Sequence, residues 1–313
     1  MKRQFTLAFF IKKLFMRKLI LYLIITGLFI QVKAQDGTIK EIQAESNKAV
    51  KSIDSNGWKK SGTFILNLSQ GALSNWAAGG ENSTLGINGI FNYSINLRSG
   101  KNTWDNNFDM ALGYQNASSF SQYRKIDDRI DLTSKYGHQL TQHWYASLLF
   151  NFNSQFLQGY DYSTTPYTKI SNFLTPGKII LAPGMNYKTA TRFSFFISPI
   201  ALRWVLKIDE DFFNVAKFGV DSAKKSNKEF GAYVTVTYKA DISKWATYTG
   251  RVDLYSNYLR NPQNVDFLMN NLLTMKFNKI FAANLSLDLI YDDDVIKRLQ
   301  VKEILGIGIT VKI

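Results

Sequence analysis

The last nine residues of the chain alternate strictly between apolar side chains and small or polar ones. One set comprises Leu305, Ile307, Ile309, Val311 and Ile313, and the other comprises Gly306, Gly308, Thr310 and Lys312. Successive side chains of a β-strand point to opposite faces, so this segment predicts a strand with one apolar and one small or polar face. Such a strand is typical of an outer-membrane β-barrel, because lipid surrounds the barrel and water or polar side chains fill it.

The same period of two recurs along the chain and predicts an all-β fold. It is clear in residues 85–97, where one face is largely apolar and the other carries mostly amides. We predict twelve strands, at 61–73, 83–98, 103–116, 127–139, 143–157, 178–189, 193–206, 230–240, 246–258, 265–278, 282–291 and 302–313. An even number of long strands predicts a closed transmembrane antiparallel β-barrel of about twelve strands.

The connections between these strands alternate between short and long. The short ones are 99–102, 140–142, 190–192, 241–245 and 279–281, and the long ones are 74–82, 117–126, 158–177, 207–229, 259–264 and 292–301. Outer-membrane barrels have short periplasmic turns and longer extracellular loops, and a periplasmic amino terminus gives this order. Large aromatic residues accompany the short turns, namely Trp104, Trp144, Phe193, Trp245 and Phe281. We expect them to form a girdle at the periplasmic interface of the membrane.

A soluble β-sandwich or a lipocalin-like barrel would also show alternating strands. Those folds hide their apolar faces in a core, and the strands expected here are too long and too numerous for one small sandwich. Aromatic rings near the ends of the apolar faces further favour a membrane barrel.

The first 34 residues predict a secretory signal peptide. They contain seven basic residues and no acidic residue, and the apolar run from Leu19 to Ile30 is shorter than the roughly 20 residues of a membrane-spanning helix. The short run also disfavours the alternative, a retained anchor helix. Ala34 offers a small residue at the cleavage point, so we expect residues 35–57 to form a periplasmic extension, mobile or folded into the lumen, and residues 58–313 to form the barrel in the outer membrane.

Charge and composition limit the partners. Loss of the seven basic residues of the signal lowers the net charge from +14 to +7, and the remaining basic residues are scattered. We therefore expect lipid and lipopolysaccharide of the outer membrane, and other outer-membrane proteins, as partners, but no nucleic acid. The chain contains no cysteine, which excludes disulfides and thiolate metal sites.

The residues that could support catalysis or metal binding are few. The two histidines, His138 and His143, flank a short turn on the expected periplasmic side, away from the face where outer-membrane hydrolases open. Acidic runs at 292–294 and 209–211 lack the spaced ligands and turn glycine of a calcium loop, so we interpret them as solvated loop charge. We predict no enzymatic activity, no cofactor and no metal site.

The inward face predicts two alternative functions. It carries charges of both signs and many amides, and we expect Asp131, Lys135, Arg251 and Asp253 to line the lumen. Twelve strands lie between barrels that side chains fill and porins with an aqueous channel. The barrel is therefore either a narrow channel for small polar solutes or a closed scaffold or accessory subunit of an outer-membrane assembly, export or nutrient-uptake complex. Aromatic residues in the long loops, such as Tyr160 and Tyr162, could stack on sugars, pack on a partner or fold over the barrel mouth.

One loop motif carries a family resemblance. The sequence from Trp76 through Gly79 and Gly80 to Asn82, together with the preceding Gly-Trp-Lys-Lys at 57–60, resembles the opening of a Bacteroidota family catalogued as domain of unknown function 3078. The resemblance implies an outer-membrane location and supplies no activity or catalytic residues. The residues themselves predict a tight extracellular reversal at the two glycines with Trp76 at the outer interface, and a dedicated binding role is the alternative.

Overall fold

The computed structural model of the 313-residue chain describes residues 56–72, 83–189 and 192–312. Every described residue belongs to the unit Ile53–Ile313. The predicted signal peptide, the extension at 35–57 apart from its last two residues, and the loop motif Trp76, Gly79, Gly80 and Asn82 lie outside the described residues. Within the described residues, no helix is long and apolar enough to cross a membrane.

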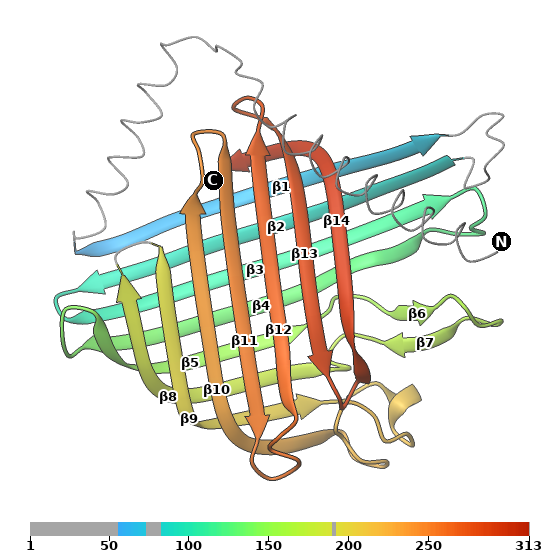
Figure 1. Cartoon of the computed structure of the whole chain (residues 1–313). Helices are drawn as coiled ribbons and strands as arrows, with labels where there is room; N and C mark the ends of the chain where they lie inside the picture. The colour runs from blue at the N-terminus through green and yellow to red at the C-terminus, as the bar shows by residue number, and fades with distance from the viewer. Residues whose placement is uncertain (1–55, 73–82, 190–191, 313) are drawn as a thin grey trace, which may run out of the picture. The chain divides into compact units, whose positions relative to one another are not determined.

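Twelve strands of the described chain close into one antiparallel barrel (Figure 1). They are β1 (Gly57–Ala72), β2 (Ser83–Ser99), β3 (Asn102–Ala117), β4 (Arg124–Gln139), β5 (Trp144–Ser154), β8 (Gly177–Thr189), β9 (Phe193–Leu206), β10 (Ser226–Asp241), β11 (Ala246–Asn257), β12 (Val265–Lys276), β13 (Phe281–Asp292) and β14 (Ile296–Lys312). Each pairs with its neighbours along the chain, and β14 returns to pair with β1, with Phe64 opposite Val311. The predicted fold class is confirmed, and every predicted strand overlaps one of these twelve.

The long connections are partly structured. The loop between β5 and β8 contains a hairpin of β6 (Gly159–Asp161) and β7 (Thr168–Ser171), and the loop between β9 and β10 contains the short 3-10 helix η2 (Glu210–Phe212). Three loops are shorter than predicted, because β4 begins at Arg124, β10 at Ser226 and β14 at Ile296. The predicted long loop at 292–301 was therefore wrong, since only residues 293–295 connect β13 to β14. We call the end of the barrel that carries the hairpin and η2 the loop end, and the opposite end the turn end.

The outer wall is apolar, as the alternation predicts. Leu305 and Ile307 on β14 are 60% and 59% exposed, whereas Gly306, Gly308 and Thr310 of the same strand are buried inside. Similar outward apolar side chains occur around the barrel, including Phe64, Leu68, Leu85, Ile87, Leu112, Leu148, Ile197, Ile200, Leu202, Val301 and Ile309. A surface this apolar around a whole barrel needs lipid rather than water against it.

Apolar side chains also enter the lumen. Leu149, Ile180, Phe196 and Tyr233 belong to a buried cluster on the inner wall of β5 and β8 to β11. Leu272 on β12 packs against a second cluster, formed by Ile65, Ile90 and Ala111 of β1 to β3. Strands β13 and β14 separate β12 from β1 in the barrel, so this contact spans part of the lumen. The interior is thus more apolar than the sequence indicated.

Gly308 allows β14 to close against β1. A Cβ atom added there would lie 1.9 Å from the carbonyl oxygen of Leu66, so any side chain must push the two backbones apart. We expect Gly308→Ala to destabilise the folded barrel by about 1–3 kcal/mol, the usual cost of overpacking. Thermal unfolding of the detergent-folded protein measures this. Gly89→Ala is the matched control, because its Cβ would meet nothing closer than 3.8 Å. Equal stability of the two variants would contradict the steric account.

Candidate functional site

The lumen is the site where functional side chains converge. Inward positions on the strands carry acidic, basic and amide groups, and many of these groups pair with partners on distant strands. Because alternate residues face inward, the parity of a residue within its strand decides whether it enters the lumen. The contacts across the lumen then depend on which strands face each other in the closed barrel.

Arg251 on β11 bridges the lumen. Its Nη1 donates to Oδ1 of Asp131 at 3.1 Å, and Asp131 lies on β4. Four strands separate β11 from β4 in one direction around the barrel and six in the other, so the two residues occupy opposite walls. The Nε of Arg251 also pairs with Asp253 at 2.8 Å, and Tyr233 donates to Asp253 at 2.9 Å. One side chain therefore joins the two walls.

The opposing carboxylate has its own local partners. Asp131 accepts hydrogen bonds from Asn151 and Thr133, each at 3.0 Å. These donors lie on β4 and β5, next to Asp131. Side chains on its own wall therefore supply the hydrogen bonds that water would otherwise give to the carboxylate. A buried carboxylate needs this kind of compensation, because burial without partners costs several kcal/mol.

A second set of ion pairs joins β4 to β13 and β14. Arg129 pairs with Asp109 at 2.6 Å and with Asp288 at 3.4 Å. Lys302 pairs with Asp127 at 2.6 Å and with the same Asp288 at 2.8 Å. Four strands separate β4 from β13 by the shorter way around the barrel, so this set also crosses the lumen. Together the five charged groups form a continuous network, which we call the Arg129 network.

Further pairs lie nearer the loop end. Lys178 on β8 pairs with Asp292 at the end of β13, again across four intervening strands. Arg203 on β9 pairs with Glu229 on β10 and Asp266 on β12, and its guanidinium lies 3.8 Å from the ring centroid of Tyr255. Charged contacts between separated strands thus occur at several levels of the barrel.

The four residues predicted to line the lumen all face inward. Asp131, Arg251 and Asp253 come together in the bridge described above. Lys135 lies apart from it and donates to Asn186 at 3.0 Å and to Ser194 at 3.1 Å. Their role in solute passage stays a prediction. Sequence reasoning did not single out Arg129 or Lys302. Arg129 lies two residues before Asp131 on the same strand, so the alternation already predicted that it faces inward.

The aromatic residues lie where the girdle hypothesis requires them. Trp104, Trp144, Trp245 and Phe281 are exposed beside the turns between strands, and Phe193 is half-buried at the first position of β9. Trp58 near the start of β1 joins them, with its ring centroid 6.0 Å from that of Trp104. Sequence reasoning missed Trp58 for the girdle, although it also lies near the turn end of its strand. Contact with a membrane interface remains a prediction.

The two histidines lie at the turn between β4 and β5. Nδ1 of His138 lies 2.8 Å from Oδ1 of Asn102, and Nδ1 of His143 lies 3.2 Å from the carbonyl oxygen of Lys188. These contacts link neighbouring strands at the turn end.

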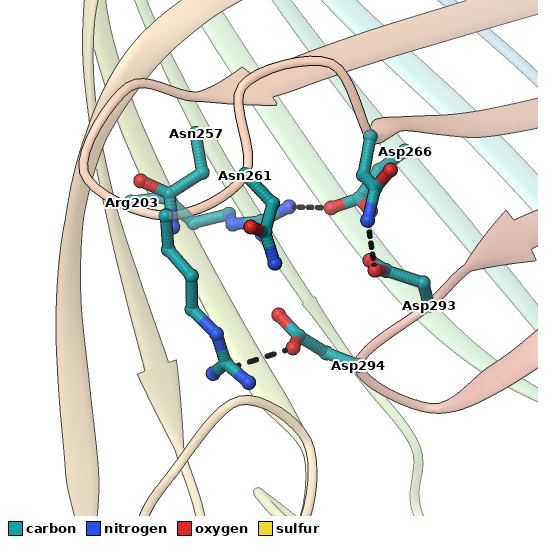
Figure 2. Close-up of a pocket in the computed structure, with 8 residues that line it drawn as sticks. Arg203, Asn257, Asn261, Asp266, Asp293 and Asp294 are labelled. Atoms are coloured by element: carbon teal, nitrogen blue, oxygen red, sulfur yellow. Dashed lines mark hydrogen bonds and ion pairs between the residues drawn. The ribbon is translucent and has the colours of Figure 1, made fainter.

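An acidic group at the loop end differs from the prediction. Carboxylate oxygens of Asp266, Asp292 and Asp293 lie within 4.8 Å of one another, and Asp266 and Asp293 line the pocket in Figure 2. Each has a partner, namely Arg203, Lys178 and Asn264 respectively, and Arg260 pairs with Asp294 at 3.5 Å. The interpretation of 292–294 as solvated loop charge was wrong for Asp292, which is buried. It faces the lumen and compensates Lys178.

The second acidic run holds two loops together. The side chain of Asp209 is 8% exposed and pairs with Lys169 of β7 at 2.6 Å, and Lys169 also pairs with Asp211 at 2.8 Å. The interpretation as solvated charge was thus wrong for Asp209 as well. Hydrogen bonds to the two carboxylates raise the pKa of Lys169. Burial alone would raise the pKa of Asp209, but hydrogen bonds from Lys169 and Asn172 outweigh it and lower that pKa.

The chain is similar to one protein family in sequence and to several solved structures. A family model described as a protein of unknown function (DUF3078) matches residues 68–160, which confirms the predicted resemblance. No curated protein matches the sequence. Among solved structures, the translocator domain of the autotransporter NalP from Neisseria meningitidis is 12% identical, with a TM-score of 0.35 over 87% of this chain and 95% of that one.

Two further solved structures show a similar degree of likeness to this chain. The COG4313 outer membrane channel from Pseudomonas putida F1 is 9% identical, with a TM-score of 0.37 over 82% of this chain and 95% of that chain. The NanC porin is 10% identical, with a TM-score of 0.36 over 79% of this chain and 98% of that chain.

The pairing of Asp209 with Lys169 predicts an acid-sensitive loop contact. A lowered carboxyl pKa stabilises the folded state above the ordinary pKa, and this contribution is lost as the pH falls through the lowered value. A spin label at Thr165→Cys in the β6–β7 hairpin reports the contact cleanly, because the chain has no other cysteine. We expect an ordered label at neutral pH that becomes mobile only as the pH falls from the ordinary aspartate range of about 4 through the lowered pKa of Asp209.

The substitution Asp209→Asn should make the same label mobile already at neutral pH. Asp221→Asn is the control, because Asp221 pairs with Lys224 in an exposed position within the same loop. A label that is equally ordered in both variants would show that the Lys169 contact does not hold the hairpin.

Proposed function

We propose that this protein is a non-enzymatic, integral outer-membrane β-barrel that provides a narrow, side-chain-gated path for small polar solutes. The apolar outer wall supports the membrane location, and the short turns support a periplasmic turn end with the loop end outside. Charges of both signs inside the barrel suit polar solutes rather than apolar ones.

The observation that carries this proposal is the contact between Arg251 and Asp131. It joins opposite walls through one long side chain, so that a rotamer change of Arg251 removes the bridge without moving the backbone. At 3.1 Å it is longer than the 2.8 Å contact between Arg251 and Asp253. Separation leaves Arg251 paired with Asp253 on its own strand, and it leaves Asp131 bonded to Asn151 and Thr133. Neither charge is orphaned, which keeps the energetic cost of opening low.

A second candidate function is the closed barrel that acts as a scaffold or accessory subunit of an envelope complex. The packing of Leu272 against the cluster of Ile65, Ile90 and Ala111 favours it, because apolar contacts across the lumen exclude water and solutes. This candidate predicts stable co-purification with other envelope proteins in mild detergent. It also predicts no conductance when the Arg251 contact or the Leu272 contact across the lumen is weakened.

Single-channel conductance in a planar bilayer tests the proposal. We expect the purified, folded protein to conduct in small steps, and Arg251→Ala to raise the step size roughly twofold or more, because the substitution removes a side chain that crosses the lumen. Lys135→Ala is the matched control, since Lys135 faces the same lumen but bonds to an amide and a hydroxyl. Silence of the wild-type protein, of Arg251→Ala and of Leu272→Ala would exclude a channel and leave the scaffold.

A further inference from the structure

A second cavity lies at the loop end of the barrel, between β4 and the β6–β7 hairpin. Its volume is about 260 Å³, which is close to the lower end of the roughly 300–1,000 Å³ common for small-ligand sites. We call it the vestibule and define it by Lys125, Asp127, Asp128, Tyr160, Ser171 and Lys302. Figure 1 shows the β6–β7 hairpin at the ends of the barrel strands. Residues of this hairpin form part of the lining of the cavity.

The charges of the vestibule cancel in local pairs. Lys125 pairs with Asp128 at 2.6 Å, and Lys302 pairs with Asp127 at 2.6 Å. An anionic or a cationic solute would therefore find no unpaired countercharge among these four groups. A zwitterion would have to break both ion pairs to form its own. A neutral polar solute can instead accept hydrogen bonds from the ammonium groups of Lys125 and Lys302 as they stand, because each has three N–H donors and two partners.

The remaining groups favour a polyhydroxylated solute. The ring of Tyr160 supplies apolar surface in the lining, and the hydroxyl of Ser171 and the ammonium groups of Lys125 and Lys302 supply hydrogen-bonding groups. A sugar ring has the matching chemistry, with an apolar face of C–H groups and a rim of hydroxyls that both donate and accept. The volume is large enough for one monosaccharide.

Two lining residues of the vestibule belong to the Arg129 network. Asp127 and Lys302 line the cavity, and Lys302 also pairs with Asp288, the partner of Arg129 deeper in the lumen. A solute bound in the vestibule thus contacts the charged groups that cross the barrel below it.

We propose that the vestibule is a binding site for a neutral monosaccharide and forms the outer subsite of the path; the second half of this statement rests on the proposed function. Isothermal titration of the full mature protein in detergent tests the site. The probes are D-glucose, D-galactose and D-mannose as neutral hexoses, glycine as a zwitterion, and inorganic phosphate as an anion. We expect at least one hexose to bind and neither glycine nor phosphate to do so.

Two variants locate the binding. Tyr160→Ala should weaken hexose binding roughly fivefold, the equivalent of an aromatic contact of about 1 kcal/mol. Ser171→Ala should weaken it to a smaller extent. Tyr123→Ala is the matched control, because Tyr123 is an exposed tyrosine in another loop outside the vestibule, and we expect it to bind like the wild type. A difference in gel migration between unheated and heated samples establishes that each variant is folded.

The outcomes separate this proposal from the proposed function. Hexose binding by a protein that never conducts would support the vestibule and overturn the channel. Conductance without hexose binding would overturn the vestibule alone. Preference for glycine or phosphate, or hexose affinity unchanged in both Tyr160→Ala and Ser171→Ala, would also overturn it.

Discussion

Closure of β14 onto β1 is the constraint on which the rest of the structure depends. A strand edge in a membrane leaves backbone N–H and C=O groups without water, and each unpaired group costs several kcal/mol. The pairing of β1 with β14 removes that edge, and it aligns outward apolar residues such as Leu66 and Ile309 side by side. The closed circle then fixes which strands face each other across the lumen, and hence which inward charges can meet.

Strand positions were predictable, because period-two alternation reports a local property. Each strand needs only lipid on one side and the lumen on the other, so parity alone assigned Asp131, Arg251 and Asp253 to the interior. The start of β14 was not predictable in this way. Residues 296–301 contain Lys297 and Arg298, both exposed, and a strand that projects beyond the apolar band has no reason to alternate.

The contacts across the lumen could not be derived from the sequence. Whether Arg251 meets Asp131 or another acid depends on strand tilt and stagger, which are properties of the closed barrel. The same holds for Leu272, whose inward parity was available but whose packing against residues of β1 to β3 was not. The burial of Asp292 was missed for the same reason. A run of three aspartates near a turn resembles solvated charge, and the partner that compensates Asp292, Lys178, lies on the opposite wall.

The choice of ion pairs over apolar contacts bears on function. Buried ion pairs are often no more stabilising than apolar side chains of similar volume, because desolvation cancels much of their attraction. A barrel that needed only to be sealed could repeat the packing of Leu272 against Ile65, Ile90 and Ala111 at every level. Instead, the levels containing Arg251, Arg129 and Lys178 are crossed by charges. Charged crossings can exchange their hydrogen bonds with water or a polar solute, whereas apolar crossings cannot. The charged crossings at these levels therefore support the proposed path, whereas the packing of Leu272 supports the alternative of a closed barrel.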